Sequence, residues 1–562
     1  MNLLEQLKKD LLSVCQSLGL DLDSSEISIE IPKDDKFGDY STNLALRIIE
    51  KGNPIENAEK IKKALEELKL EYLEKIEVVK PGFINFYLSS SFLSNQLKLL
   101  LNNIKKVDKI GQSVVVEFTD PNPFKEFHIG HLYSNIVGES LSRILEFKGN
   151  DVKRLCYQGD VGLHVAKAIY GLIHDLEDSK ISFEELEKQN LEDRIKFLGQ
   201  AYAFGAQVYE ENEAKKEEIN QLNKKIYEKD PSILNLYEKG REWSLDYFDL
   251  IYNRLGTHFD HFYFESEAGI RGIKIIKEHL KDGIFEESEG AVIFDGEKYG
   301  LHKRVFINSL GLPTYEAKEL GLAEQKYEDF KYDQSIIVTA KEVSDYFKVL
   351  IKALSLIKPD LAEKTRHIGH GFVKLPEGKM SSRSGNIITG EWLLDESVKK
   401  VKESFPEMDK KTAEKVGVGA VKYSLLKSGL GKDVVFDFDQ SISLEGNSGP
   451  YLQYTFARCL SVMAKKTSKT DDFATGAISR EDEALLKKVV KFESQFIFTR
   501  EISQSTLCTY LYELASIFNL FYQKCPILKS ENEDFRLSLT NATSKILEQG
   551  LYLLGIDAPE KM

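Results

Sequence analysis

The sequence predicts an α/β chain in which a largely parallel sheet with a helical insertion follows a small α/β domain and precedes an all-α bundle. Three observations carry this prediction. From about residue 110 to 395, short β-branched runs alternate with helical patterns, which is typical of parallel βαβ units. A charged stretch without strand signals, about residues 178–250, interrupts that block, and the pattern over residues 396–562 is helical throughout.

The first block, residues 1–105, combines helical patterns with two strand-like pieces. These pieces are SEISIEIP at residues 25–32 and GFINFYLS at residues 82–89. The polar run KKVDK, residues 105–109, indicates a linker. We therefore expect residues 1–105 to form a small α/β domain of their own.

The central block, residues 110–395, contains five short apolar runs that predict strands of a largely parallel sheet. They are SVVVEF (113–118), DVKRLCY (151–157), GAVIF (290–294), RVFIN (304–308) and QSIIVTA (334–340). The charged residues 178–250 predict a helical insertion within this block. The last block, residues 396–562, ends in the apolar helical pattern LTNATSKILEQGLYLLGI, which is consistent with a bundle.

Composition narrows the class of protein. The chain has 562 residues, of which 42% are hydrophobic and 30% charged, which suits a multi-domain protein in water. No apolar stretch approaches the length of a membrane span and the first helical pattern contains acids, so we expect a cytoplasmic protein without a membrane partner. The five cysteines form no CxxC pair, which argues against a zinc knuckle or a disulfide framework. The net charge of −14 argues weakly against nucleic acid as a partner.

The stretch DPNPFKEFHIGHLYS, residues 120–134, places two histidines around a glycine directly after a predicted strand. Apolar residues at helical spacing predict a helix from about His128 to Phe147, closed by Gly149. Residues three apart share a helical face, so His128 and His131 can contact one ligand. The start of a helix also favours an anion such as phosphate.

An isolated pair of histidines has less specific interpretations. Two histidines near a helix end are often exposed or satisfied by local hydrogen bonds. Zinc-binding helices usually space their histidines differently and no cysteine lies nearby, so we expect no metal site formed by the protein.

A second polar segment, HGFVKLPEGKMSSRSGN, occupies residues 370–386. Pro376, Gly378 and Gly385 predict a loop. Its basic side chains, Lys379 and Arg383, together with three serine hydroxyls can contact a polyphosphate. A Ser/Lys/Gly loop is common on protein surfaces, so this segment alone is weak evidence.

The two segments together resemble the HIGH and KMSKS signatures of class I aminoacyl-tRNA synthetases, whose Rossmann-type catalytic domain brings both to one ATP site. Four further stretches resemble the arginyl-tRNA synthetases of that class. They are KFGDYSTNLAL (36–46), VEFTDPNPFKEFHIGHLYSNIVGESLSRILEFKGNDV (116–152), GNSGPYLQYTFAR (446–458) and the ending LGIDAPEKM. The resemblance implies a catalytic domain at residues 110–395, a tRNA-contacting domain at 1–105 and an anticodon-binding domain at 396–562.

The resemblance implies roles for individual residues around ATP. The expected catalytic residues are His128, His131, Lys125 and Lys379. Contacts with ATP are expected from His128, Gly130, His131, Lys379, Met380, Ser381, Ser382 and Arg383, with Gly130 against the adenine and Mg²⁺ accompanying the nucleotide. Ser382 stands where most class I enzymes have the second KMSKS lysine. We expect Lys125 to substitute for it, because arginyl enzymes without that lysine carry one near this position.

The arginine site is expected at Glu117, Asn122, Tyr315 and Glu319. A guanidinium group has five rigid donors and needs carboxylates and a hydroxyl around it. Without the resemblance, Tyr315 and Glu319 would be an ordinary helical pair four residues apart. Two positions of this site depart from the family: Glu319 stands where Asp is usual, and Val343 stands at the usual Gln position, so that one substrate hydrogen bond is either missing or supplied by Glu342.

The tRNA-binding residues implied by the resemblance are Tyr451, Gln453, Tyr454 and Arg458. The expected substrates are L-arginine, ATP and tRNA(Arg), and we expect a monomer. We also expect that deletion of residues 436–562 abolishes tRNA charging and leaves the catalytic block able to fold. Two alternatives are another class I synthetase or related nucleotidylyltransferase, and a non-catalytic tRNA-binding paralogue of the same fold.

Overall fold

The computed structural model describes residues 3–20, 22–32, 34–48, 53–102, 111–376, 388–466, 478–497 and 503–562. The chain divides into two compact units. The first comprises Met1–Lys106, Tyr451–Gly550 and Ala558–Met562, and the second comprises Val107–Pro450 and Leu551–Asp557. The predicted loop residues Lys379, Met380, Ser381, Ser382 and Arg383 lie outside the described residues.

The first unit begins with a three-stranded antiparallel sheet of order β1-β3-β2 and four helices. In chain order these elements are α1 (Leu3–Ser17), β1 (Tyr40–Thr42), α2 (Leu44–Arg47), α3 (Pro54–Glu67), β2 (Leu73–Val79), β3 (Phe83–Leu88) and α4 (Ser90–Asn102). The strand predicted at residues 82–89 is therefore confirmed as β3. The one predicted at residues 25–32 is wrong, because Ser24–Glu26 forms a 3₁₀ turn capped by Asp23 and only Glu30 pairs, with Ser41.

Helices of the C-terminal region complete the first unit. They are α18 (Gly449–Met463), α19 (Arg480–Phe492), a π-helical turn at Glu493–Ile497, α20 (Gln504–Lys524) and α21 (Glu533–Leu553). The N-terminal sheet is tied to them by buried polar contacts. The carboxylate of Asp39 lies 3.2 Å from Lys491, and the hydroxyl of Tyr40 donates to Ser494 at 2.9 Å.

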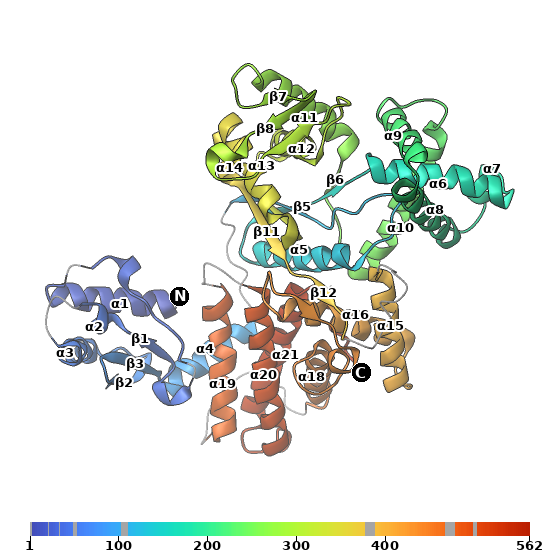
Figure 1. Cartoon of the computed structure of the whole chain (residues 1–562). Coiled ribbons are helices and arrows are strands. Elements are labelled where there is room, and N and C mark those ends of the chain that lie inside the picture. Colours follow the sequence, from blue (N-terminus) through green and yellow to red (C-terminus); the bar gives the residue numbers. More distant parts are fainter. Residues whose placement is uncertain are drawn as a thin grey trace. The chain divides into compact units, whose positions relative to one another are not determined.

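The second unit is built on a five-stranded parallel sheet of order β11-β10-β4-β5-β6 (Figure 1). The strands are β4 (Ser113–Phe118), β5 (Asp151–Gln158), β6 (His261–Phe264), β10 (Gln334–Ala340) and β11 (Thr365–His370). The strand of this sheet that comes first in the chain, β4, is central, and the order reverses between β4 and β10. Parallel sheets bind ligands beyond the carboxyl ends of the strands at such a reversal, so the segments after β4 and β10 are the expected place of a site.

The predicted parallel sheet is confirmed, although its membership differs. The runs at residues 113–118, 151–157 and 334–340 form β4, β5 and β10. The other two runs form β8 (Ala291–Phe294) and β9 (Arg304–Ile307), which pair antiparallel in a separate three-stranded sheet with β7 (Glu286–Ser288). The parallel sheet is completed instead by β6 and β11.

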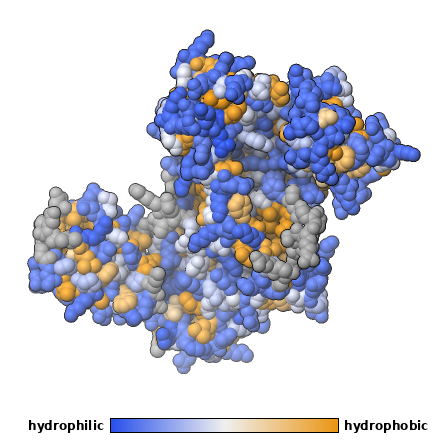
Figure 2. Space-filling model, viewed as in Figure 1, coloured by the Kyte–Doolittle hydropathy of each residue, from blue (hydrophilic) through white to orange (hydrophobic). Residues whose placement is uncertain are grey.

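Two further groups of helices belong to the second unit (Figure 1). One group includes α11 (Glu265–His279), α12 (Tyr315–Phe330), α13 (Ser344–Ile357) and α14 (Pro359–Lys364). The other is the predicted insertion, with α6 (Leu163–Ser179), α7 (Phe183–Glu187), α8 (Leu191–Glu211), α9 (Glu213–Tyr227) and α10 (Leu234–Leu255). The insertion packs around its own apolar core, which includes Trp243, and Figure 2 shows a mostly hydrophilic surface over it.

The remaining elements of the second unit are α5 (Ile129–Phe147), β12 (Val373–Lys374), α15 (Gly390–Ser404), α16 (Lys410–Leu426), β13 (Val434–Val435) and α17 (Phe438–Ser441). The strand β13 pairs with β12, so the region after residue 396 is not helical throughout as predicted. No helix among the described residues has the length and apolar character needed to cross a membrane. All five cysteines are buried and free, as expected of apolar core residues.

Candidate active site

A cavity of about 490 Å³ opens at the reversal between β4 and β10. It brings together residues that lie more than 200 positions apart in the chain. Those predicted from sequence that line it are Glu117, Asn122, His128, Gly130, His131, Tyr315 and Glu319. The predicted ATP-binding and arginine-binding groups among the described residues therefore share one cavity.

The chain leaves β4 through a strained segment. Thr119, Asp120 and Phe124 have φ of 81°, 45° and 66°, in the left-handed region that non-glycine residues avoid. The buried start of α5 holds this segment, because the N–H of Thr119 donates to Ser134 Oγ at 2.9 Å and Asn135 Nδ2 donates to Thr119 Oγ1 at 3.0 Å. Strain of this kind persists where surrounding contacts enforce it and is frequent at functional sites.

His128 caps the N-terminus of α5. Its Nδ1 accepts hydrogen bonds from the N–H groups of Gly130 at 3.1 Å and His131 at 3.3 Å. A neutral ring that accepts at Nδ1 must carry its proton on Nε2. The cap therefore fixes the tautomer of His128 as an Nε2–H donor.

The free N–H groups expected at the start of α5 are already used. Two of them donate to His128, and the N–H of Ile129 donates to the carbonyl of Ile388 at 3.1 Å. The prediction that backbone groups here receive an anion is therefore corrected. An anion at this end of α5 would meet the histidine rings.

The two histidine rings stack with centroids 3.5 Å apart and an interplanar angle of 23°, which confirms that they share one face. Burial, together with the nearby charge of Lys125, lowers the pKa of His128 to about 4. Burial also holds the pKa of His131 well below its usual value. Both rings are therefore neutral at physiological pH and act through hydrogen bonds. The Nδ1 atom of His131 is buried and has no hydrogen-bond partner among the described residues.

Two positions of the site must be glycine because a neighbouring side chain lies too close to the backbone for a Cβ atom to fit. A Cβ on Gly130 would lie 2.9 Å from Cε1 of His128, so the ring can pack over the helix start only if residue 130 lacks a side chain. A Cβ on Gly159, just beyond β5, would lie 2.3 Å from Oδ1 of Asn122. That glycine lets the predicted arginine-binding amide sit against the end of β5.

The cavity is lined by carboxylates, and several of them already have cationic partners. Glu117 pairs with Lys326 at 2.6 Å, Glu265 pairs with Lys318 at 2.5 Å, and Glu316 lies 3.7 Å from Arg304. Such pairs compensate the cost of burying charge.

Two further carboxylates in the cavity, Asp120 and Glu319, make no ion pair within the described residues. Burial raises the pKa of each well above its usual value, and the charge of Glu117 raises it further. A bound cation would favour the ionised forms of these carboxylates. The electrostatics of the cavity therefore fit a positively charged ligand.

Sequence reasoning missed two tyrosines of the cavity. The hydroxyl oxygens of Tyr157 and Tyr346 are buried and have no hydrogen-bond partner among the described residues. Tyr346 lies on α13, three residues after Val343, and Val343 and Glu342 line the cavity as well. The position of Tyr157 near the carboxyl end of a predicted parallel strand was the signal that could have identified it.

Lys125 is near the histidines but does not line the cavity. Its Nζ lies 4.8 Å from the ring centroid of Tyr202 on α8, and its charge contributes to the lowered pKa of both histidines. The segment that follows the KMS loop is tied to the same place, since Thr389 bridges to His128 and the N–H of Gly390 donates to Phe127 O at 2.7 Å. Thr389 and Gly390 therefore lie beside His128.

The predicted tRNA-binding residues lie on α18. The guanidinium of Arg458 stacks on two rings, 4.7 Å from that of Tyr454 and 5.0 Å from that of Tyr522, and Tyr451 accepts a hydrogen bond from Asn519 at 3.0 Å. Tyr451, Tyr454 and Arg458 are partly exposed.

Gln453 differs from its three neighbours, because its side chain is fully buried at 0% exposure. The expectation of a direct RNA contact by Gln453 is therefore corrected. Its place on α18 makes it part of the packing beneath the exposed residues.

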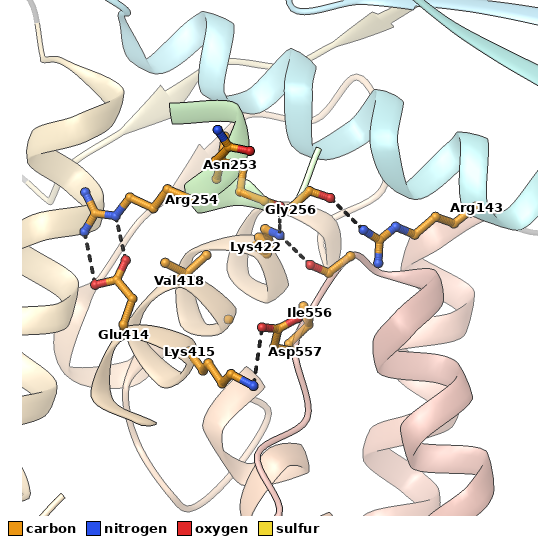
Figure 3. A pocket seen from close by; sticks show the side chains of 13 residues that line it. Arg143, Asn253, Arg254, Gly256, Glu414, Lys415, Val418, Lys422, Ile556 and Asp557 are labelled. Carbon is orange, nitrogen blue, oxygen red and sulfur yellow. Dashed lines mark hydrogen bonds and ion pairs between the residues drawn. The ribbon is translucent and has the colours of Figure 1, made fainter. Parts of the chain in front are cut away.

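A second, smaller cavity of about 100 Å³ lies beside the C-terminal half of α5, between the end of α10, α16 and the C-terminal tail (Figure 3). Lys422 is buried there, and its ammonium donates to the carbonyls of Leu255, at 2.6 Å, and Gly555. Burial lowers the pKa of Lys422 to about 8. Arg143 donates to the tail carbonyl of Tyr552 at 3.0 Å.

These contacts bear on whether the catalytic block can fold after deletion of residues 436–562. The tail Leu551–Asp557 belongs to the second unit, and its carbonyl groups satisfy Lys422 and Arg143. A chain without the tail would leave a buried ammonium without one of its acceptors, which is strongly destabilising. These contacts argue against the expectation that the catalytic block folds without residues 436–562.

Comparison with known proteins places the chain in a family. The family model "tRNA synthetases class I (R), catalytic domain" matches residues 94–438, which is more than half of the chain. The arginine–tRNA ligase of Clostridium perfringens is 31% identical over 97% of this chain and 98% of its own length. The chain belongs to the arginyl-tRNA synthetase family. The family's N-terminal domain model matches residues 3–88, and the "DALR anticodon binding domain" model matches residues 452–562.

Other relatives and solved structures agree with this assignment. The arginine–tRNA ligase of Treponema denticola is 31% identical over 96% of this chain and 95% of its own. The fold is similar to Thermus thermophilus arginyl-tRNA synthetase (TM-score 0.79, 23% identity, all of both chains) and to the enzyme from Plasmodium falciparum (TM-score 0.80, 23% identity, 99% of both). The comparisons support an arginine–tRNA ligase, and they give no support to a non-catalytic paralogue.

Proposed function

We propose that the cavity at the reversal of the sheet activates L-arginine with ATP. The observation that carries this proposal is the pair Asp120 and Glu319, which line the cavity beside two neutral histidines, have raised pKa values and form no direct ion pair within the described residues. The guanidinium group of arginine supplies the missing positive charge and five donors. In this arrangement Glu117, Asn122, Tyr315 and Glu319 hold the side chain of arginine.

The first step forms arginyl-adenylate. A carboxylate oxygen of arginine attacks the α-phosphorus of ATP, the bond to the β-phosphate oxygen breaks, and pyrophosphate leaves with Mg²⁺, which enters with the nucleotide. The Nε2–H of His128 donates to a phosphate oxygen, and Lys125, Lys379 and Arg383 stabilise the growing negative charge. The residues position charged groups, and no covalent enzyme intermediate is needed.

The second step transfers the arginyl group to the terminal ribose of tRNA(Arg). A ribose hydroxyl attacks the carbonyl carbon of the adenylate, and AMP leaves. We assign residues 1–105 and 396–562 to tRNA contacts and residues 110–395 to catalysis. We place the protein in the cytoplasm as a monomer.

Charging of tRNA tests this function directly. Full-length protein with ATP, Mg²⁺, tRNA and one radiolabelled amino acid at a time should form acid-precipitable label with arginine. Label with a different amino acid and none with arginine would identify another synthetase. A chain that binds tRNA without charging it would be the non-catalytic paralogue.

Arg458→Ala should weaken the use of tRNA. Removal of the guanidinium frees the rings of Tyr454 and Tyr522, which it holds at 4.7 and 5.0 Å, and base stacking on such rings contributes about 1–3 kcal/mol. We therefore expect the KM for tRNA in charging assays to rise by roughly 10- to 100-fold.

Lys524→Ala is the matched control for Arg458→Ala. It also removes one positive charge from this helical bundle, where Lys524 is exposed and pairs with Glu481 at 2.8 Å. The control should leave the KM for tRNA close to that of the wild type. Equal KM values for tRNA in wild type and Arg458→Ala would remove Arg458 from the RNA-contacting surface.

A further inference from the structure

Lys326 is a buried lysine that the proposed chemistry has not used. It lies on α12 with 1% of its surface exposed, and its Nζ donates to Oε2 of Glu117 at 2.6 Å. Both side chains of the pair are 2% exposed. A buried ion pair contributes little net stability compared with apolar residues of the same size, so its presence at a ligand cavity calls for a functional explanation.

The charge of Lys326 acts on more than its direct partner. It lowers the pKa of Asp120 and of Glu319, whereas Glu117 and burial raise both. The titratable groups that face this cluster are Glu117 on β4, Asp120 after it, Cys156 and Tyr157 on β5, Glu265 on α11, Glu319 and Lys326 on α12, Tyr332 before β10, and Tyr346 on α13. Lys326 is the cation that both Asp120 and Glu319 share.

We propose that Lys326 is a positioning residue for recognition of the arginine side chain. It fixes one oxygen of Glu117, so that the other remains for the guanidinium, and it sets the protonation state in which the carboxylate cluster meets the ligand. This inference rests on the proposed function of the cavity in binding arginine.

The direction in which the KM for arginine changes with pH follows from the effect of the Lys326 charge on Asp120 and Glu319. Raised pKa values mean that Asp120 and Glu319 must lose protons before they pair with a guanidinium, so the KM for arginine falls as pH rises. Loss of the positive charge at position 326 raises those pKa values further. The falling part of the KM profile then moves to higher pH.

The test compares Lys326→Met, Lys326→Arg and wild type in ATP–pyrophosphate exchange with tRNA present, from about pH 6 to pH 9. For Lys326→Met we expect the fall in the KM for arginine to move up by about one to two pH units, while the KM for ATP stays near the wild-type value. Lys326→Arg keeps the charge and should return the profile to its wild-type position. If Lys326→Met does not fold, Lys326→Gln carries the same comparison.

Lys491→Met is the matched control, because Lys491 forms a buried pair with Asp39 at 3.2 Å and neither residue lines the cavity. It should lower thermal stability as Lys326→Met does and leave the pH profile in place. A wild-type profile in both Lys326→Met and Lys326→Gln, or a shifted profile in Lys326→Arg, would overturn the inference. Wild-type protein that fails to use arginine at any pH would instead overturn the proposed function.

Discussion

Lys125→Ala is expected to slow the formation of arginyl-adenylate by about 100-fold or more, the scale of losing one preorganised electrostatic group. Departure of pyrophosphate builds negative charge, and Ser382 stands where a lysine would be expected to meet it. Lys125 is close enough to lower the pKa of His128 and His131, so its ammonium acts at the same end of α5. The rate is measured by pyrophosphate exchange at saturating arginine, ATP and tRNA.

Two further variants separate this role of Lys125 from packing. Lys167→Ala removes a comparable cation–π contact inside the insertion, where Lys167 lies 4.0 Å from the ring of Tyr209, and should leave the rate near that of the wild type. Adding Ser382→Lys to Lys125→Ala should recover part of the rate if the two positions serve one role. A normal rate of adenylate formation in Lys125→Ala would exclude Lys125 from the mechanism.

Glu319→Gln is expected to raise the KM for arginine by about 10- to 100-fold, which corresponds to one hydrogen bond to a charged group. The amide keeps the size of the side chain and cannot carry the charge that a guanidinium pairs with. Because Glu319 acts on the side chain of arginine, the KM for ATP should change little. Both constants come from pyrophosphate exchange with one substrate varied at a time.

Glu328→Gln gives the comparison on the same helix. Glu328 pairs with Arg271 at 2.5 Å on the outer face of α12 and does not line the cavity. Its replacement should leave both KM values unchanged. An unchanged dependence on arginine in Glu319→Gln would mean that the cavity reads arginine through other carboxylates.

The sequence predicts those parts of the fold that local pattern determines. The helix α5, its closing glycine Gly149 and the strand before it follow directly from periodicity and turn residues. The runs that form β8 and β9 were expected in the parallel sheet, like the run that forms β5. They pair elsewhere because an apolar run predicts a strand but does not specify its partner. β6 and β11 escape prediction because HFYF is short and TRHIGH is mostly polar.

For the site, too, the sequence predicts residues that lie in motifs but not contacts between distant parts of the chain. Glu117, Asn122, Tyr315 and Glu319 are accessible from sequence because they lie in motifs of a family, and the structure places all four in one cavity. The buried partner of Glu117 is 209 positions away in the chain, and no spacing rule identifies it. The hydrogen bonds from the N–H groups of Gly130 and His131 to His128 could not be predicted either, because sequence alone does not show which group caps the start of α5.

The central claim is that this cavity activates arginine, and exchange of pyrophosphate into ATP measures that step alone. With full-length protein, Mg²⁺ and tRNA, the account predicts exchange that depends on L-arginine and is absent with citrulline, which has the same shape without the charge. By family resemblance, omission of tRNA should suppress the exchange. Equal exchange with citrulline and arginine, or none with arginine in the presence of tRNA, would contradict the account.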